Sequence, residues 1–144
     1  MTSVPMPSLL HNGDVATRVP VITQVIADTF TNHDVLCRND GSHHLLFKFE
    51  RSKGAAKCVQ MHPMAFVLKS GESLSLSVTI DTGRRALSHI RRSDRIEILC
   101  SFERNTVNGV EHKGSATIPI VLKRKDGRDW TPSPTRECDK TIKK

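Results

Sequence analysis

The sequence predicts an all-β fold, a sandwich or small barrel of about seven short strands. Its clearest signal is the stretch 74–80, where leucine, valine and isoleucine alternate strictly with serine and threonine. A period of two describes a strand with one buried and one solvated face. Turn-forming residues recur roughly every 8–14 positions, and a helical period is limited to a single turn at 86–90. These observations favour strands along most of the chain.

The first half of the chain contains three expected strands. Residues 19–27 form the first of them. Residues 35–39 and 43–50 flank the dipeptide Asp40-Gly41, which is typical of a tight hairpin turn. We therefore expect a hairpin at this dipeptide.

The second half is divided by Lys53-Gly54, by an irregular link around Pro63 and by Asn108-Gly109. Further strands are expected at 57–61, 73–81, 96–100 and 115–122. Pro119 lies inside the last of them, and a proline there indicates an edge strand or a bulge.

The pattern divides the chain into three parts. Residues 1–18 are predicted to be a loose arm, 19–125 the sandwich, and 126–144 a basic, disordered tail without an apolar repeat. Trp130 is the exception in the tail. It either stays there or folds back onto the sandwich, since burial of an indole gains roughly 2–3 kcal/mol.

Composition limits the setting and the chemistry of this chain. Aromatic residues make up 4% of it, so the core must be mainly aliphatic. The cysteines form no C-x-x-C pair, so we expect Cys37, Cys58 and Cys100 to be core thiols, with neither a metal nor a disulfide. No signal peptide or membrane-spanning run is recognisable, which favours a cytoplasmic, reducing setting. Because the nucleophile-elbow, phosphate-loop and zinc-protease motifs are missing, we expect a protein without cofactor or enzymatic activity.

The net charge of +7 is unevenly distributed. The segment 84–95 carries five arginines and one aspartate, and the segment 123–144 carries eight basic and four acidic residues. The remainder is close to neutral, so anionic partners are expected to meet this one loop and this tail.

A series of strings carries a family likeness through its order and spacing. They lie at 36–42, 47–49, 57–63, 66–73 and 93–98. The first two match a strand of the type L-x-N-x-S followed by F-K-V, and the last stands where sperm proteins have N-D-R-I-T-V. Over residues 20–125 the chain resembles the major sperm protein (MSP) domain, as a divergent member. That domain is shared by nematode major sperm proteins and by vesicle-associated-membrane-protein-associated adaptors.

The resemblance implies an immunoglobulin-like, seven-stranded sandwich of the MSP and PapD type. It also implies a protein-interaction module, which acts either as a scaffold or adaptor or as a cytoskeletal component that assembles with itself. In the sperm branch the domain forms homodimers that assemble into filaments. In the adaptor branch a basic surface binds acidic peptide tracts with two phenylalanines.

Carried over from the adaptor branch, the binding positions begin at Lys48, Arg51 and Ser52 and continue at Arg95. Glu50 and Glu97 stand where that branch has a basic and an apolar residue, and they oppose an acidic ligand. With the basic loop, the predicted partner-binding residues are Lys48, Arg51, Ser52, Arg84, Arg85, Arg91, Arg92 and Arg95.

A second hypothesis assigns the basic loop 84–95 and the tail to nucleic acid or to another anionic surface. Arginine contacts to phosphate give salt-dependent, sequence-independent affinity. The loop has no interleaved aromatic residues for base stacking, which favours the protein-binding hypothesis.

Overall fold

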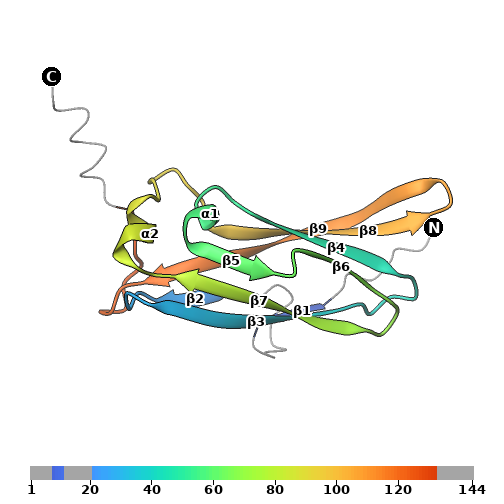
Figure 1. Ribbon diagram of the computed structural model, residues 1–144, viewed down its shortest axis with the longest axis horizontal. Helices are drawn as coiled ribbons and strands as arrows, with labels where there is room; N and C mark the ends of the chain where they lie inside the picture. The colour runs from blue at the N-terminus through green and yellow to red at the C-terminus, as the bar shows by residue number, and fades with distance from the viewer. Residues whose placement is uncertain (1–7, 12–20, 133–144) are drawn as a thin grey trace, which may run out of the picture.

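The computed structural model describes residues 8–11 and 21–132, which form two β-sheets packed face to face (Figure 1). The strands are β1 (Ser8–His11), β2 (Ile22–Val25), β3 (Phe30–Arg38), β4 (Leu45–Arg51), β5 (Val59–His62), β6 (Ala65–Leu68), β7 (Ser73–Asp81), β8 (Glu97–Thr106) and β9 (Gly109–Lys123). Two short helices, α1 (Ala55–Cys58) and α2 (Arg84–Ser88), follow β4 and β7.

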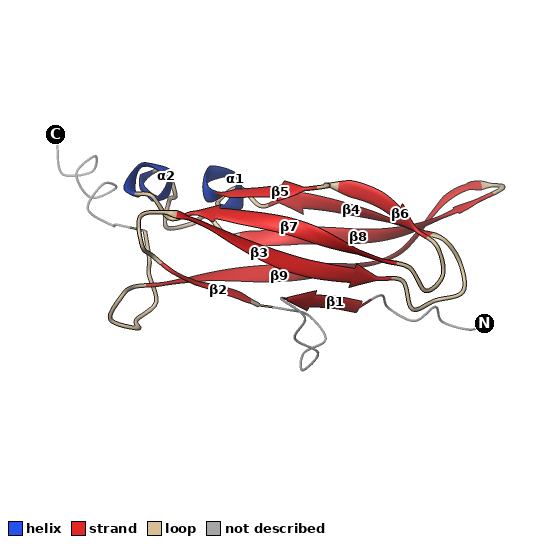
Figure 2. Cartoon of the chain, turned by 60° about the horizontal axis from the view of Figure 1, so that its bottom comes forward, coloured by secondary structure: helices blue, strands red, loops and turns tan. Residues whose placement is uncertain are grey.

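The sheets have the strand orders β1-β3-β7-β5 and β2-β9-β8-β4-β6. Neighbouring strands run antiparallel except β2 and β9, which are parallel. Figure 2 shows both helices at the same end of the sandwich. The predicted all-β sandwich is therefore confirmed.

The strand with the clearest sequence signal is β7, and its bounds are those predicted. Leu76, Val78 and Ile80 are buried, as the alternation requires. On the opposite face Ser77 and Thr79 donate hydrogen bonds of 3.0 and 3.1 Å to Asn32 Oδ1 on β3. The solvated face of this strand is thus also tied to its neighbour.

The core between the sheets is mainly aliphatic, as the composition predicts. Its aromatic part centres on Phe47, whose ring stacks on Phe66 at 5.2 Å and meets Phe102 edge-on at 5.3 Å. Cys37 and Cys58 are buried free thiols, as expected, and so is Cys100.

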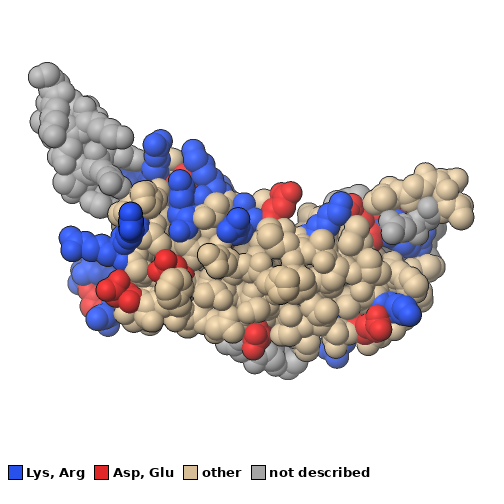
Figure 3. All heavy atoms as spheres, in the orientation of Figure 1, with Lys and Arg blue, Asp and Glu red and all other residues tan. Residues whose placement is uncertain are grey.

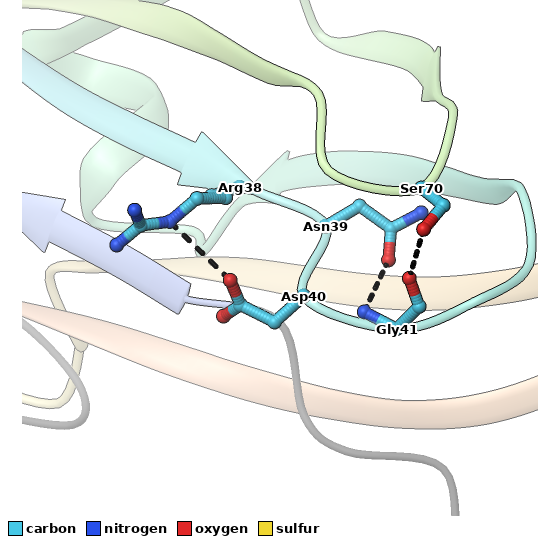
Figure 4. A network of polar contacts seen from close by, with 5 residues as sticks. All are labelled: Arg38, Asn39, Asp40, Gly41 and Ser70. Carbon is cyan, nitrogen blue, oxygen red and sulfur yellow. Dashed lines mark hydrogen bonds and ion pairs between the residues drawn. The ribbon is translucent and has the colours of Figure 1, made fainter.

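The predicted hairpin at Asp40-Gly41 is wrong, because β3 and β4 belong to different sheets. The segment 39–44 instead crosses from one sheet to the other. Asn39 is fully buried, and its Oδ1 accepts a 3.0 Å hydrogen bond from the Gly41 N–H, which makes a side-chain-closed turn (Figure 4). Its Nδ2 donates to two carbonyl oxygens, those of His43 at 2.6 Å and Leu68 at 2.9 Å.

Two segments contain elements that the pattern did not predict. β1 lies within the predicted loose arm, where it pairs with β3 and buries Leu9, so the arm is wrong for residues 8–11. The rest of the arm lies outside the described residues. The helix α1 occupies the start of the strand expected at 57–61, and β6 follows Pro63, whose peptide bond with His62 is cis.

The last strand is longer than predicted and is central, not at an edge. β9 pairs with β8 on one side and β2 on the other. The register shift in this hairpin lies at Phe102/Glu103, away from Pro119. The Ile120 N–H donates to the carbonyl oxygen of Ile96, the residue just before β8. The nitrogen of Pro119 therefore faces β2, and it is tolerated there because β2 pairs with β9 only from Ile22, opposite Ile120.

Trp130 folds back onto the sandwich. Its main-chain N–H donates to Leu122 O at 2.8 Å, and its side chain packs against the core. A bridge between Lys123 and Asp129 closes this return. The prediction of a disordered tail is therefore wrong for residues 126–132, while 133–144 lie outside the described residues.

Candidate functional site

The candidate site is the end of the sandwich that carries both helices. Two chain segments bring positive charge there, 51–57 around α1 and 84–95 around α2, and the two helices contact each other. In Figure 3 lysine and arginine side chains gather at this end of the molecule. We call this surface the basic end; its members are Arg51, Lys53, Lys57, Arg84, Arg85, Arg91, Arg92 and Arg95.

Ser52 joins the two segments. Its Oγ donates to Arg95 O at 2.6 Å and accepts a hydrogen bond from the Glu97 N–H at 2.9 Å. The Gly54 N–H donates to the same Arg95 carbonyl at 3.0 Å. A Cβ at Gly54 would lie 2.5 Å from that oxygen, so only glycine permits this close approach. Main-chain contacts therefore fix α1 against the end of the arginine-rich segment.

The acidic residues near α2 bind main-chain N–H groups rather than arginine side chains. Asp28 Oδ1 accepts from the Arg84 N–H at 3.2 Å, and Asp81 Oδ1 accepts from the Gly83 N–H at 2.8 Å. Asp94 Oδ2 accepts from the Arg91 N–H at 3.0 Å. These bonds shape the loop and leave the guanidinium groups directed to solvent.

The cations of the basic end form no ion pairs with described carboxylates, a property that they share with Lys69, Lys125 and Arg128. Elsewhere on the described surface, Arg38 pairs with Asp40, Lys48 with Glu103, Arg104 with Glu111, Lys123 with Asp129 and Arg124 with Asp126. Within residues 8–11 and 21–132, no carboxylate pairs with any of the eight side chains of the basic end. An anionic partner would therefore meet cations whose charge is not already neutralised.

A hollow of about 80 Å³, open to solvent, adjoins α1 at this end. Arg51 and Lys57 line it together with Asp81 and with Phe30, whose side chain is 68% exposed. Arg51 is held in place because its Nη1 donates to Val59 O at 2.9 Å. The hollow thus presents both charges and an aromatic face, but at about 80 Å³ it is too small to enclose a small-molecule substrate.

The structure brings together six of the eight predicted partner-binding residues. Arg51 ends β4 just before α1, and the five arginines of 84–95 lie on α2 or in the segment after it, so these six belong to the basic end. Lys48 does not belong to it. Its side chain lies on the outer face of β4, where Nζ forms an ion pair with Glu103 Oε1 at 2.9 Å. Ser52 is an internal link, as its hydroxyl is used by two main-chain groups.

The two predicted acidic obstacles have different surroundings. Glu50 is exposed on β4 and lies opposite Leu99 of β8. Glu97 is half-buried, and its N–H is held by Ser52. Both are on the five-stranded sheet rather than on α2, so they leave the α2 arginines unopposed.

Sequence reasoning missed Lys53, Lys57 and Phe30. Lys53 precedes α1 and Lys57 lies in its last turn. A predicted helix would have been the signal, since Gly54-Ala55-Ala56 has little β preference. Phe30 gave no signal, because a single aromatic residue at a strand start is usually buried.

The buried cysteines offer no reactive centre. Burial raises the pKa of the Cys37 thiol to about 12. Burial, with a smaller contribution from Asp81, raises that of Cys58 to about 11. The pKa of Cys100 is raised as well, first by burial and then by Cys37. In the described part of the chain, no group of three or more histidine, cysteine or acidic side chains is arranged to hold a metal ion. None of its helices has the length and apolar character needed to cross a bilayer.

The arrangement of the two sheets is shared with a known domain. The chain is similar to PapD-like domain 7, an ASH domain, of human CEP192, at 12% identity and a TM-score of 0.50, over 86% of this chain and 89% of that one. The chain has a PapD-like, immunoglobulin-like fold. The predicted fold is thereby confirmed, and at this identity the likeness concerns the fold alone.

Two structures from Caenorhabditis elegans are similar at lower TM-scores. SSP-19, an MSP-domain protein like family member, has 16% identity and a TM-score of 0.49, over 70% of this chain and 92% of that one. WR4, an MSP family member, has 13% identity and a TM-score of 0.46, over 69% and 91%. No protein-family model and no curated protein matches the sequence.

Proposed function

We propose that this protein is a non-enzymatic protein-interaction module that binds an acidic surface of a partner protein through its basic end. The observation that carries the proposal is the set of eight cations at one end, from two chain segments, without an ion pair among the described residues. The fold that the chain shares with a PapD-like domain supports a binding rather than a catalytic role by analogy.

The physical basis of the binding is long-range attraction followed by direct pairing. Unpaired arginines concentrate positive potential over α2, which speeds association with an acidic partner. Binding breaks no internal ion pair, so the electrostatic gain is not offset by a lost one. Exposed charges are screened beyond about 8–10 Å at physiological salt, so affinity must fall as salt rises.

Within this proposal the protein serves as a cytoplasmic scaffold or adaptor. A cytoskeletal role through self-assembly, with homodimers as the building unit, is the other version that the MSP-like sequence pattern supports. The two versions differ in whether the partner is another protein or a second copy.

Nucleic acid or another phosphate-rich surface is the alternative ligand of the same site. Six of the eight cations are arginines, whose planar guanidinium groups suit phosphate oxygens. Acidic protein is preferred because Phe30 is the one exposed aromatic residue that lines the hollow, whereas single-stranded binding relies on successive stacking platforms.

The test compares two variants that each lose two positive charges. Arg84→Gln/Arg85→Gln removes unpaired cations from α2, and Arg38→Gln/Arg104→Gln removes two cations that are paired elsewhere. Fluorescence anisotropy measures their binding to a labelled peptide of alternating aspartate and glutamate, at 50 and 300 mM NaCl.

We expect the α2 variant to bind the peptide roughly tenfold more weakly at 50 mM NaCl, and the control variant to bind within about twofold of the unmodified protein. Equal weakening in both variants, or no binding to the peptide at 50 mM NaCl, contradicts the proposal. A labelled single-stranded RNA of matched charge that binds more tightly than the peptide favours the alternative ligand.

A further inference from the structure

Three serines lie in the two segments of the basic end, and their hydroxyl groups have different surroundings. The Ser52 hydroxyl is bound by two main-chain groups. The Ser88 hydroxyl, at the last position of α2, donates to Arg85 O at 2.7 Å. Ser93 is exposed, and its hydroxyl forms no hydrogen bond within the described part of the chain. Of the three, Ser93 is therefore the serine whose hydroxyl is open to modification.

A turn presents Ser93 to solvent. Residues 91–94 form a four-residue turn, which is closed by a 3.0 Å hydrogen bond from the Asp94 N–H to Arg91 O. The Asp94 side chain closes the same turn, because its Oδ2 accepts from the Arg91 N–H at 3.0 Å. Ser93 occupies the third position of this turn, next to the exposed Arg92. A second protein can therefore reach the hydroxyl from solvent.

The turn can be extended locally, because the residues that anchor it to the core lie outside it. Ile90 is buried before the turn, and Ile96 packs against the core after it. Extension of the chain around Ser93 breaks the two hydrogen bonds that close the turn and leaves both anchors in place. Extension around Ser88 would instead unwind α2 and withdraw Leu87 from the core. An enzyme that needs an extended substrate therefore meets the smaller cost at Ser93.

Ser93 also has cations on both sides along the chain. Arg91 and Arg92 precede it, and Arg95 follows it by two positions. None of these arginines forms an ion pair among the described residues. Protein kinases select their substrates by such charge patterns, and unpaired arginines suit an acidic substrate groove. Ser88, by contrast, has no arginine or lysine within two positions.

We propose that Ser93 is a phosphorylation site for an arginine-directed serine kinase, and that its phosphate weakens the binding of an acidic partner at the basic end. In the transfer, Ser93 Oγ forms a bond to the γ-phosphorus of ATP, and the bond from that phosphorus to the β–γ bridging oxygen breaks. The hydroxyl proton passes to a carboxylate base of the kinase, and ADP leaves. The effect on binding rests on the proposed function, whereas the assignment of the site does not.

A phosphate at this position changes the charge of the surface strongly. Five arginines and one aspartate give the segment 84–95 a charge of +4. Phosphoserine adds about −2 at neutral pH, so the charge of the segment falls to about +2. The phosphate oxygens also accept hydrogen bonds from guanidinium groups of the turn, which are then no longer open to a partner. The change in charge equals that made by Arg84→Gln/Arg85→Gln.

The first measurement locates the phosphate. The folded full chain is incubated with ATP and the catalytic fragment of protein kinase C, which accepts a serine flanked by arginines, and tandem mass spectrometry identifies the modified residues. We expect phosphate on Ser93 and none on Ser88. Ser88→Ala, the matched control, should be phosphorylated at the same rate, whereas Ser93→Ala should lose this phosphate. A folded chain without phosphate on Ser93, or with equal phosphate on Ser88, overturns the assignment.

The second measurement compares affinities for the labelled peptide of aspartate and glutamate, by fluorescence anisotropy at 50 mM NaCl. We expect the phosphorylated chain to bind about tenfold more weakly than the untreated chain, and treatment with a phosphatase to restore the affinity. Ser93→Ala after the same kinase treatment controls for phosphate at other positions, and it should bind within about twofold of the untreated chain.

The outcomes separate the two halves of the proposal from the proposed function. A chain phosphorylated on Ser93 that binds the peptide as tightly as the untreated chain overturns the effect on binding. If the untreated chain does not bind the peptide, the proposed function fails and the effect on binding fails with it. The mass spectrum decides in either case whether Ser93 is the site.

Discussion

The side chain of Asn39 is predicted to be worth several kcal/mol, because it holds the crossing between the two sheets. Asn39→Ala removes three hydrogen bonds, two from Nδ2 to the carbonyls of His43 and Leu68 and one from the Gly41 N–H to Oδ1. Each bond contributes about 1 kcal/mol net. The residue is fully buried, so groups left without a partner add a desolvation cost of about 1–3 kcal/mol. We expect a total loss of about 4–6 kcal/mol, a large part of the 5–15 kcal/mol typical of a domain.

Two neighbouring variants calibrate this value. Ser70→Ala removes a single 2.6 Å bond to Gly41 O and should cost about 1 kcal/mol. Arg38→Ala removes a surface ion pair with Asp40, for which less than about 1 kcal/mol is expected. Figure 4 shows that all of these contacts lie in one small region, so local differences in folding context are minimal.

Urea denaturation followed by circular dichroism measures the free energy of unfolding. The midpoint should fall in the order unmodified, Arg38→Ala, Ser70→Ala, Asn39→Ala, with the slope m unchanged. If Asn39→Ala loses no more than Arg38→Ala, the buried amide does not hold the crossing and the reasoning is refuted.

Other predictions address the C-terminal return, the thiols and the β4–β8 face. Trp130→Ala should lower the free energy of unfolding by about 2 kcal/mol, since its side chain is half-buried against the core; an unchanged urea midpoint contradicts this. In a Cys138→Ser background at pH 8, native protein should not react with Ellman's reagent, whereas in 8 M urea the three buried thiols should react. The folded-state pKa of Cys37 is raised from 9.0 to about 12, so its contribution to stability is present below pH 9 and is lost as the pH rises toward 12. Comparison of urea midpoints with those of Cys37→Ala isolates that loss, and parallel pH profiles would falsify it. Lys48→Ala should leave peptide binding unchanged and lower the free energy of unfolding by about 1 kcal/mol, because Glu103 loses its cation. A tenfold loss of peptide affinity would show that Lys48 belongs to the binding site.

Periodicity predicted the strands that bury one face and failed where tertiary contacts decide. The alternation at 74–80 located β7 correctly, because one face of that strand is buried and the other is polar. Asp40-Gly41 has the composition of a hairpin turn. The buried amide of Asn39 instead stabilises a turn in which the chain crosses from one sheet to the other. Pro119 appeared to mark an edge because the parallel neighbour β2 could not be inferred from local sequence.

The site was predictable in its charge and not in its geometry. The cluster 84–95 was visible as five arginines in twelve residues, and the structure places all five at the basic end. Local sequence could not show that Gly54 packs against Arg95 O and so brings Lys53 and Lys57 alongside. Nor could it show that Lys48 is neutralised by Glu103, a residue 55 positions away that becomes a neighbour only through the β4–β8 register.

The central claim is that an acidic partner binds at the helix end of the sandwich. Titration of ¹⁵N-labelled protein with the acidic peptide, followed by two-dimensional NMR at 50 mM NaCl, tests it most directly. We predict that the largest amide shift changes fall within 51–57 and 84–95 and that 300 mM NaCl abolishes them. Shift changes centred on the outer face of the five-stranded sheet around Lys48, or on the β6 edge, would contradict it.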